Sequence, residues 1–515
     1  MLTLPGGTEI TMAPEAKMLR KWMFALMFLT APGTLAVAQD AKTLITNISK
    51  AMGYDQLKSI EYSGSGFEGT ALGQAQSAAA GWPKFTLKSF SRYIDLNAAT
   101  SQQTAVRSRP ADPSGQLPGG GGLAPLPETE QTTAINAAAS WPQKLDISLS
   151  PPGFLKLASA AASPTAKSQS INGKKYTVVS FPVDAKAPSG IPYTISGYIN
   201  DQNMIEKIRS TVEEPNLIGD MVVEQSFSGY KDQGGVKFPT RIVQTRAGLS
   251  WTDLAVTSVK ANPAAPPPPP PAGGRGGAGA GARGAAPAPP PASSKKLGDG
   301  IYMMTGGYRS VAVEFKDHIV LIEAPNNEMT TMNIIAEVKK AIPNKPIKYV
   351  VNTHTHFDHS GGLRAAVAEG ATIITHESNK PLYEKWFSNP RTLVMPDKLS
   401  QSEKKARFEY IGDKKILKDA VNTLELYHLK GVLHAEDIIV AYLPGIKTVV
   451  EADAFNAPAP NAPPPQNTNG FEKLLASELD RLKIDYTTII PVHQPAGGDR
   501  AVTKADLLRN IGRGN

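Results

Sequence analysis

The sequence predicts a β-rich N-terminal domain followed by a layered α/β domain, and three observations support this fold class. A chain of 515 residues exceeds what one hydrophobic core usually serves, because domains average roughly 150 residues. Residues 262–294 consist largely of Pro, Gly and Ala, which is typical of a linker. Alternating apolar patterns dominate residues 39–261, whereas strand-like and helix-like patterns are mixed in residues 295–515.

The amino-acid composition excludes several classes of function. The chain has no cysteine, which excludes disulfide scaffolds, thiol nucleophiles and thiolate metal sites. Any metal must therefore be held by His, Asp or Glu. The 54 basic and 46 acidic residues leave a formal charge of +8 that is spread thinly along the chain. Because no basic stripe stands out, nucleic acid is not an expected partner.

Residues 1–38 have the pattern of an export signal peptide. Arg20 and Lys21 supply its positive end, and an apolar stretch follows at residues 22–29. That stretch is too short to span a bilayer. Small residues end the segment, so we expect cleavage near Ala38. An uncleaved membrane anchor is the alternative.

The sequence after residue 38 helps to predict where the mature protein is located. No later run is long and apolar enough to be a transmembrane helix, so we expect a soluble mature protein that is periplasmic or secreted. Residues 1–17 do not fit the pattern of a signal peptide, which makes Met18 a candidate for the true start of the protein.

The N-terminal domain is expected to begin with a helix at residues 41–52 and to continue as strands. Period-two alternation predicts strands at 60–67, 85–96, 175–183, 193–200, 222–230 and 236–245. The Pro- and Gly-rich residues 110–127 are expected to form an exposed loop. Such strands can curl into a half-barrel with an apolar interior.

Two segments of this domain, residues 197–203 and 228–232, resemble periplasmic lipoprotein carriers, which cradle acyl chains. This resemblance implies an apolar ligand within residues 39–261. The alternative is a β domain that only supports the second half of the chain.

Residues 295–515 are expected to mix strands with helices. Strands are predicted at 301–305, 311–315, 319–323, 347–352, 371–375, 421–429, 438–443, 448–451 and 487–491. Helices are predicted at 331–341, 363–369 and 470–482. This mixture predicts a layered α/β domain.

The strand at 347–352 leads into a cluster of metal-binding side chains. His354, His356, Asp358 and His359 lie close together in a chain that has only 8 histidines. In an extended loop, residues two apart project to the same side, so His354 and His356 can hold one cation. Asp358 and His359, beyond the bend, then face a second cation. Two metals a few Å apart can share a bridging hydroxide.

This segment resembles the signature of the metallo-β-lactamase superfamily, whose fold is an αββα sandwich with a di-metal site at one edge. The resemblance covers residues 297–515 and implies three more ligands at the ends of later strands. His434 matches the third ligand of the first metal, Asp453 the carboxylate that bridges both metals, and His493 the last ligand of the second metal.

The resemblance also implies the chemistry. Imidazole and carboxylate ligands favour two divalent metal ions, zinc above all, with iron or manganese as alternatives. Two cations bring the pKa of a bridging water toward neutrality and polarise the scissile group. Asp358, besides binding metal, is placed as the catalytic residue that orients the nucleophile and carries its proton. The expected function is an exported, metal-dependent hydrolase.

The sequence departs from the family pattern near two ligands. His434 lacks the Gly before it and the Thr or Ser after it that many members carry. Ala452 replaces the Gly that usually precedes the bridging aspartate. Glu451 could compete as a ligand, but its side chain should point away from that of Asp453 along the strand.

The remaining histidines are expected to be structural. They are His318, His376 and His428. Among them, only His376 with Glu377 is a candidate for supporting a metal ligand through a hydrogen bond.

The substrate is expected to be a small ester, lactone or amide-type molecule, with sulfate and phosphate esters also open. β-Lactamase activity proper is one alternative, although Ala454, Phe455 and Asn456 offer no basic residue to grip a lactam carboxylate. An apolar-ligand carrier with a weakly active metal domain is the other alternative.

Overall fold

The structure is a computed structural model that describes residues 33–114, 116, 125–268, 289–460, 462–463, 465 and 468–513, with the backbone alone described for residues 33–40. Most of the expected signal peptide and most of the expected linker therefore lie outside the described residues. The expected cleavage position near Ala38 falls within the first helix, α1 (Gly33–Met52). Export and the expected domain boundaries stay predictions.

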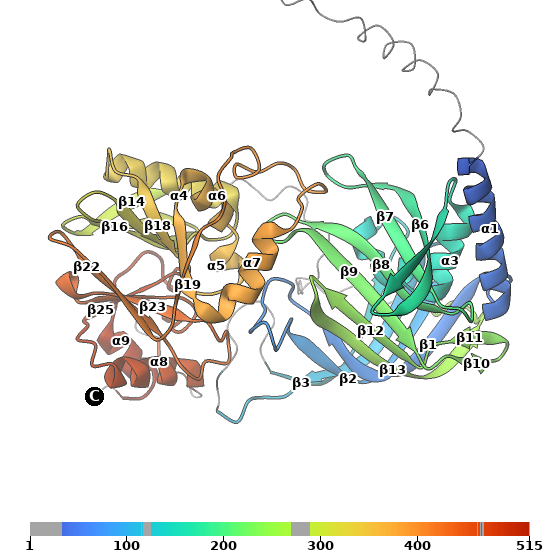
Figure 1. Cartoon of the computed structure of the whole chain (residues 1–515). Helices are drawn as coiled ribbons and strands as arrows, with labels where there is room; N and C mark the ends of the chain where they lie inside the picture. Colours follow the sequence, from blue (N-terminus) through green and yellow to red (C-terminus); the bar gives the residue numbers. More distant parts are fainter. Residues whose placement is uncertain are drawn as a thin grey trace, which may run out of the picture.

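The N-terminal half is built on one antiparallel sheet in the order β4-β3-β2-β1-β13-β12-β9-β8-β7-β6-β5. The sheet curves strongly (Figure 1), and it is open, with β4 and β5 at its two ends. Its strands are β1 (Ser59–Gly69), β2 (Lys84–Asp95), β3 (Thr100–Arg109), β4 (Leu126–Ile135), β5 (Thr165–Ile171), β6 (Lys174–Lys186), β7 (Pro192–Ile199), β8 (Ile205–Glu214), β9 (Gly219–Ser228), β12 (Arg241–Arg246) and β13 (Leu249–Ala261).

One predicted strand of this domain is wrong. Residues 236–245 form two elements, β11 (Val236–Phe238) and β12, and β11 pairs with β10 (Lys231–Gln233) as a separate hairpin. The break falls at Pro239, which has no N–H to donate to a strand ladder. Five strands of the large sheet were not predicted: β3, β4, β5, β8 and β13. In β3, β4 and β5 the exposed faces are polar and the apolar alternation is weak.

Helices pack against the β5–β8 end of the sheet. Besides α1 they are α2 (Leu145–Ser148) and α3 (Pro151–Ala160), and α3 contacts β6 and β8. Ser150 caps α3 by accepting a hydrogen bond from the Gly153 N–H. Phe154 of α3 lies directly over Gly197 of β7, where an added Cβ would be 2.4 Å from the ring. The helix thus fills this part of the sheet's apolar face, and an apolar ligand in the domain stays a prediction.

The C-terminal half contains two sheets that face each other. The first has the order β14-β15-β16-β17-β18-β19-β20 and the second β21-β22-β23-β24-β25-β26. Their strands are β14 (Ser293–Gly298), β15 (Ile301–Gly306), β16 (Tyr308–Glu314), β17 (Ile319–Ile322), β18 (Ile347–Val351), β19 (Thr372–His376), β20 (Phe408–Ile411), β21 (Lys414–Lys418), β22 (Thr423–His428), β23 (Ile439–Leu443), β24 (Thr448–Glu451), β25 (Thr488–Pro491) and β26 (Val502–Thr503).

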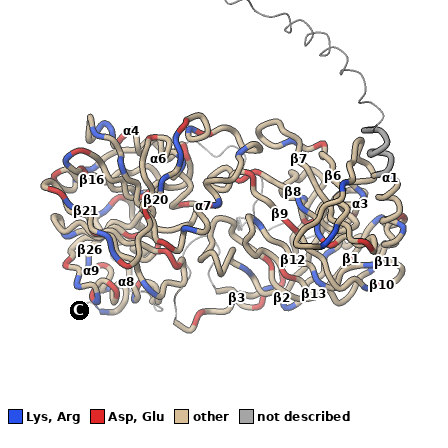
Figure 2. The backbone as a smooth tube through the Cα atoms, viewed as in Figure 1, with Lys and Arg blue, Asp and Glu red and all other residues tan. Residues whose placement is uncertain are grey.

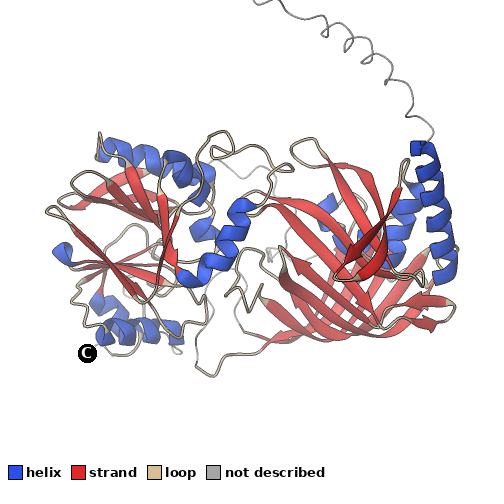
Figure 3. Ribbon diagram, viewed as in Figure 1, coloured by secondary structure: helices blue, strands red, loops and turns tan. Residues whose placement is uncertain are grey.

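Helices cover the outer faces of both sheets, which makes four layers (Figure 3). α4 (Glu328–Ala341) and α6 (Leu363–Glu369) cover the first sheet, and α8 (Gly470–Arg481) and α9 (Lys504–Asn510) cover the second. α5 (Phe357–Ser360) and α7 (Lys380–Ser388) lie at the edge next to the N-terminal half (Figure 1). Strand β17 shows how one sequence serves two interfaces: Val320 and Ile322 join the core between the sheets, while Ile319 and Leu321 join the core under the helices. The predicted class, a β-rich domain followed by an αββα sandwich, is confirmed.

Parallel pairing places the functional loops at one edge. β17, β18, β19 and β20 pair in parallel, and so do β24 and β25. Because parallel strands end at the same edge of a sheet, the loops after them lie together. These loops contain every metal-ligand candidate of the sequence except His434, which follows β22.

The two halves pack against each other through aromatic side chains. Trp82, in the loop between β1 and β2, stacks on Trp386 of α7 with ring centroids 6.1 Å apart. The same indole meets the edge of Phe357 at 6.3 Å. Farther along the interface, Asp220 accepts hydrogen bonds from the backbone of Thr392 and Leu393.

Two surface properties complete the description. In the part of the chain that is described, no helix has the length and apolar character needed to cross a membrane. Basic and acidic residues are interspersed over both halves (Figure 2).

Trp82→Ala is expected to lower the free energy of unfolding by about 3–5 kcal/mol, because the buried indole leaves a cavity between the halves. Urea unfolding followed by circular dichroism measures the effect. Met395→Ala is the control, since that side chain is 63% exposed, and its effect should stay within about 0.5 kcal/mol. Equal effects of the two changes would contradict this account of the interface.

Candidate metal centre

The loop after β18 delivers four candidate ligands through a sharp change of direction. It carries His354 and His356 in extended backbone and then enters α5, which holds Asp358 and His359. Two glycines follow and permit close packing. At Gly362 an added Cβ would lie 1.8 Å from the Thr331 hydroxyl of α4. This Gly is therefore needed for α4 and α6 to approach each other.

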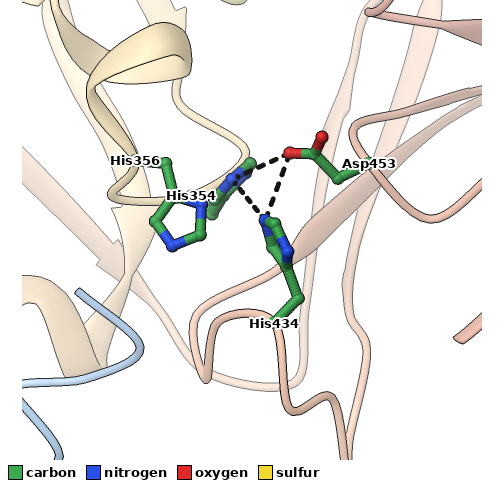
Figure 4. Close-up of side chains that lie close together, drawn as sticks. All are labelled: His354, His356, His434 and Asp453. Carbon is green, nitrogen blue, oxygen red and sulfur yellow. Dashed lines mark hydrogen bonds and ion pairs between the residues drawn. The ribbon is translucent and has the colours of Figure 1, made fainter. Parts of the chain in front are cut away.

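A first group of side chains comprises His354, His356, His434 and Asp453 (Figure 4). Their ligand atoms lie within 4.8 Å of one another, and all four side chains are buried. His354 Nε2 is 3.2 Å from His434 Nε2 and 3.1 Å from Asp453 Oδ2. The His356 ring stands 4.3 Å from that of His434, centroid to centroid.

A second group comprises Asp358, His359 and His493. His359 Nε2 lies 3.1 Å from His493 Nε2 and 3.5 Å from Asp358 Oδ2. Asp358 and His493 are only partly buried, so this group lies nearer to solvent than the first. The structure thus brings together all seven residues expected from the sequence, in the two expected sets.

Asp453 touches both groups. Its Oδ2 is 3.1 Å from His354 Nε2 and 2.9 Å from His359 Nε2, while its Oδ1 is 2.8 Å from His493 Nε2. The residue has a left-handed backbone with φ of 65°, a strained conformation of the kind that clusters at functional sites. The carboxylate is therefore placed to be shared by two cations.

The residues fit a pair of metal ions. Both ring nitrogens of His356 and Nδ1 of His434 are buried without a hydrogen-bond partner among the described residues, and buried polar atoms normally have partners. The nitrogens of His354 and His434 approach each other as ligands of one ion do. Ligand atoms about 2.1 Å from zinc in a tetrahedron are roughly 3.4 Å apart. The donors that converge here are imidazole nitrogens and carboxylate oxygens, which suit divalent metals.

Electrostatics keep His354, His356 and Asp358 in their binding forms. At His359 burial alone would lower the pKa, but the carboxylates of Asp453 and Asp358 outweigh it and raise that pKa well above its usual value. Burial lowers the pKa of His354 to about 3 and that of His356 well below its usual value, so both rings stay neutral. Burial alone would raise the pKa of Asp358, but the neighbouring His359 outweighs it and lowers that pKa. Asp358 is therefore an ionised carboxylate.

Supporting side chains orient the ligands, and sequence reasoning missed them. Glu323 accepts the Thr353 N–H at 2.9 Å and lies 3.0 Å from His359 Nδ1, which turns Nε2 of that ring toward the centre. Glu323 is fully buried and has a φ of 75°. Its position at the end of β17 is the one signal that could have pointed to it.

Asp358 has two further partners that the sequence did not predict. The Tyr308 hydroxyl donates to its Oδ2 at 3.2 Å, and the Gln74 amide donates to its Oδ1 at 2.9 Å. Gln74 belongs to the N-terminal half. No local sequence signal marks either residue, because each reaches Asp358 only through folding.

Residues expected outside the ligand set take other roles. Glu451 is buried and holds the turn after β24 by accepting the N–H groups of Ala454 and Phe455, and burial raises its pKa to about 8. His376 bonds Ser378 and stacks on His428, and these contacts involve no candidate ligand.

Residues 307–497 match the family model described as the metallo-beta-lactamase superfamily. The matched segment lies in the C-terminal half and contains all seven candidate ligands. The chain is also 25% identical over 224 residues to the linear primary-alkylsulfatase of Pseudomonas sp. (strain ATCC 19151). That match covers 37% of this chain and 42% of the relative, so the chain spans less than half of the relative's length.

Solved structures similar to this chain include two with named sources. The metallo-beta-lactamase from Pontibacter korlensis is 18% identical with a TM-score of 0.33, covering 43% of this chain and 98% of its own. The metallo beta lactamase from Hirschia baltica is 18% identical with a TM-score of 0.32, covering 43% and 97%. DIM-1 metallo-beta-lactamase is 16% identical with a TM-score of 0.33, covering 44% and 97%.

His434→Ala is expected to remove about one metal ion per chain, because it deletes a donor of the first group only. Asp453→Ala should remove both ions, since its carboxylate touches both groups. Elemental analysis after dialysis measures the metal content, and circular dichroism checks folding. His318→Ala is the control, since that ring packs on Phe315 and pairs with Asp317. Full metal content in Asp453→Ala would refute the shared carboxylate.

Proposed function

We propose that the protein is a metal-dependent hydrolase that binds two divalent cations, zinc being the ion its donor set suits best. One observation carries the proposal: five histidines and two aspartates from separate loops converge, and Asp453 links the two groups. Cations bound there supply a water of lowered pKa and a Lewis acid for the scissile group.

The chain's own residues act on what enters the site. Asp358 is ionised, partly exposed and held at both oxygens, so it can orient an attacking water and accept its proton. The Tyr308 hydroxyl lies beside Asp358 and its ring lies 4.7 Å from that of His493. Burial raises the pKa of Tyr308, which keeps its proton available as a hydrogen-bond donor.

The substrate we propose is a small ester, lactone or amide-type molecule. Sulfate esters are the second candidate, favoured by the similarity to a linear primary-alkylsulfatase. A β-lactam is less favoured. Ala454 and Phe455 are buried behind Asp453, so this segment presents no cation to a lactam carboxylate.

We also propose export, on the strength of the sequence pattern in residues 1–38. The mature N-terminus is expected next to Ala38 in protein recovered from the periplasm or the medium. Mass spectrometry of the intact chain measures it. An N-terminus at residue 1 or at Met18 would contradict cleavage.

Asp358→Asn is expected to lower kcat by about 10²–10⁴-fold with a smaller change in KM, because the amide cannot accept the proton of water. The assay is a panel of an aryl acetate, a lactone, an aryl sulfate, a phosphodiester and a cephalosporin, run first on the wild-type protein. Asp485→Asn is the control, since that carboxylate is 73% exposed and pairs with Lys447 on the surface. A metal-loaded wild-type protein that cleaves none of the panel would refute the proposed function.

A further inference from the structure

The loop between β1 and β2, residues 70–83, approaches the metal centre from the N-terminal half. The Phe357 N–H, at the start of α5, donates to the Gly73 carbonyl at 2.9 Å. Gly73 has a φ of +92°, and an added Cβ would lie 2.5 Å from the Phe357 ring. Only a glycine allows this approach without displacing one of the two segments.

The same loop also contacts the ligand-bearing loop after β22. Gln76 donates its side-chain amide to the Leu433 carbonyl at 2.7 Å, and its own carbonyl accepts the Glu436 N–H at 2.9 Å. These bonds flank His434. The loop is thus held on two sides of the centre, and Gln74 lies between the two attachment points.

Gln74 makes one side-chain hydrogen bond among the described residues, and it goes to Asp358. Its amide nitrogen donates to Oδ1 at 2.9 Å, while its Oε1 is buried without a partner among those residues. A side chain that served only to tie the halves together would satisfy both ends of its amide, because an unpaired buried oxygen costs stability. This arrangement therefore favours a role at Asp358.

The hydrogen bond from Gln74 to Oδ1, together with the one from Tyr308 to Oδ2, fixes which way the Asp358 carboxylate turns. With Oδ1 bonded to Gln74, Oδ2 is the oxygen nearest to the second group, 3.5 Å from His359 Nε2 and 3.8 Å from His493 Nε2. A bond to a ligating carboxylate orients it for the metal.

We propose that Gln74 is a positioning residue that the N-terminal domain contributes to the active site, holding Asp358 in the orientation needed for the second metal ion. The N-terminal domain is then part of the catalytic unit. This inference rests on the proposed metal-dependent function.

Gln74→Leu tests the proposal, because leucine approaches glutamine in size but donates no hydrogen bond. Titration of the metal-free full-length chain with zinc against a competing chelator is the primary readout. The second binding event should weaken about 10–100-fold while the first is unchanged. On any substrate that the wild-type protein cleaves, kcat should fall by a similar factor with little change in KM.

Ser77→Ala is the matched control, since this partly buried side chain of the same loop bonds only the Ala80 N–H among the described residues. It should titrate like the wild type. Gly73→Ala is a second test, because displacement of the loop should weaken the second binding event without touching the Gln74 side chain. Thermal unfolding by circular dichroism reports folding for each variant.

The outcomes separate the two proposals. If the wild type binds two zinc ions and Gln74→Leu binds them equally well, the positioning role is overturned and the proposed function stands. If Gln74→Leu weakens both binding events equally together with thermal stability, the residue is structural and the inference is overturned. A wild-type chain that binds no metal overturns both proposals.

Discussion

The structure depends on the enclosure of Asp453 by imidazoles. The carboxylate is almost fully buried, and burial alone would raise its pKa, but the surrounding histidines, His359 foremost, hold that pKa well below its usual value. A buried charge needs such compensation. Asp453 also has a left-handed backbone, which the turn after β24 must maintain. The Glu451 carboxyl holds this turn through hydrogen bonds from Ala454 and Phe455, and the pairing of β24 with β25 fixes the strand from which the turn starts. These parts of the sandwich therefore help to position Asp453.

The core around the candidate ligands contains buried polar atoms without hydrogen-bond partners, which is expected of atoms that bind a metal. Both ring nitrogens of His356 and one of His434 are buried with no partner among the described residues, although a protein of ordinary core composition satisfies nearly all such atoms. The burial that keeps His354 and His356 neutral also suits these two rings to divalent cations. These unpaired atoms destabilise the fold, and the apolar side chains packed on both faces of each sheet offset that loss of stability.

The interface that holds the two halves together also contacts the metal-ligand candidates. Trp82 packs on Trp386 and Phe357, and Phe357 immediately precedes Asp358. The loop that anchors the two halves is therefore the one that reaches the carboxylate. A change in how the domains pack would be transmitted to Asp358 through contacts of a few Å, without any rearrangement of the sandwich itself.

The local pattern of residues predicted a layered α/β domain and the cluster from His354 to His359, because period-two alternation and close spacing of histidines are properties of short segments. The αββα arrangement and the ligands His434, Asp453 and His493 came from the resemblance of that cluster to a family signature. It failed at residues 236–245, where Pro239 interrupts the ladder, and at the polar strands β3 to β5, whose pairing partners replace the missing apolar signal. Only the tertiary structure decided that Gln74, Tyr308 and Glu323 surround the ligands. Each is far in sequence from the residue it contacts, so no local pattern could reveal the pairing; the packing of one domain on the other, and of loops at a shared sheet edge, brings them together.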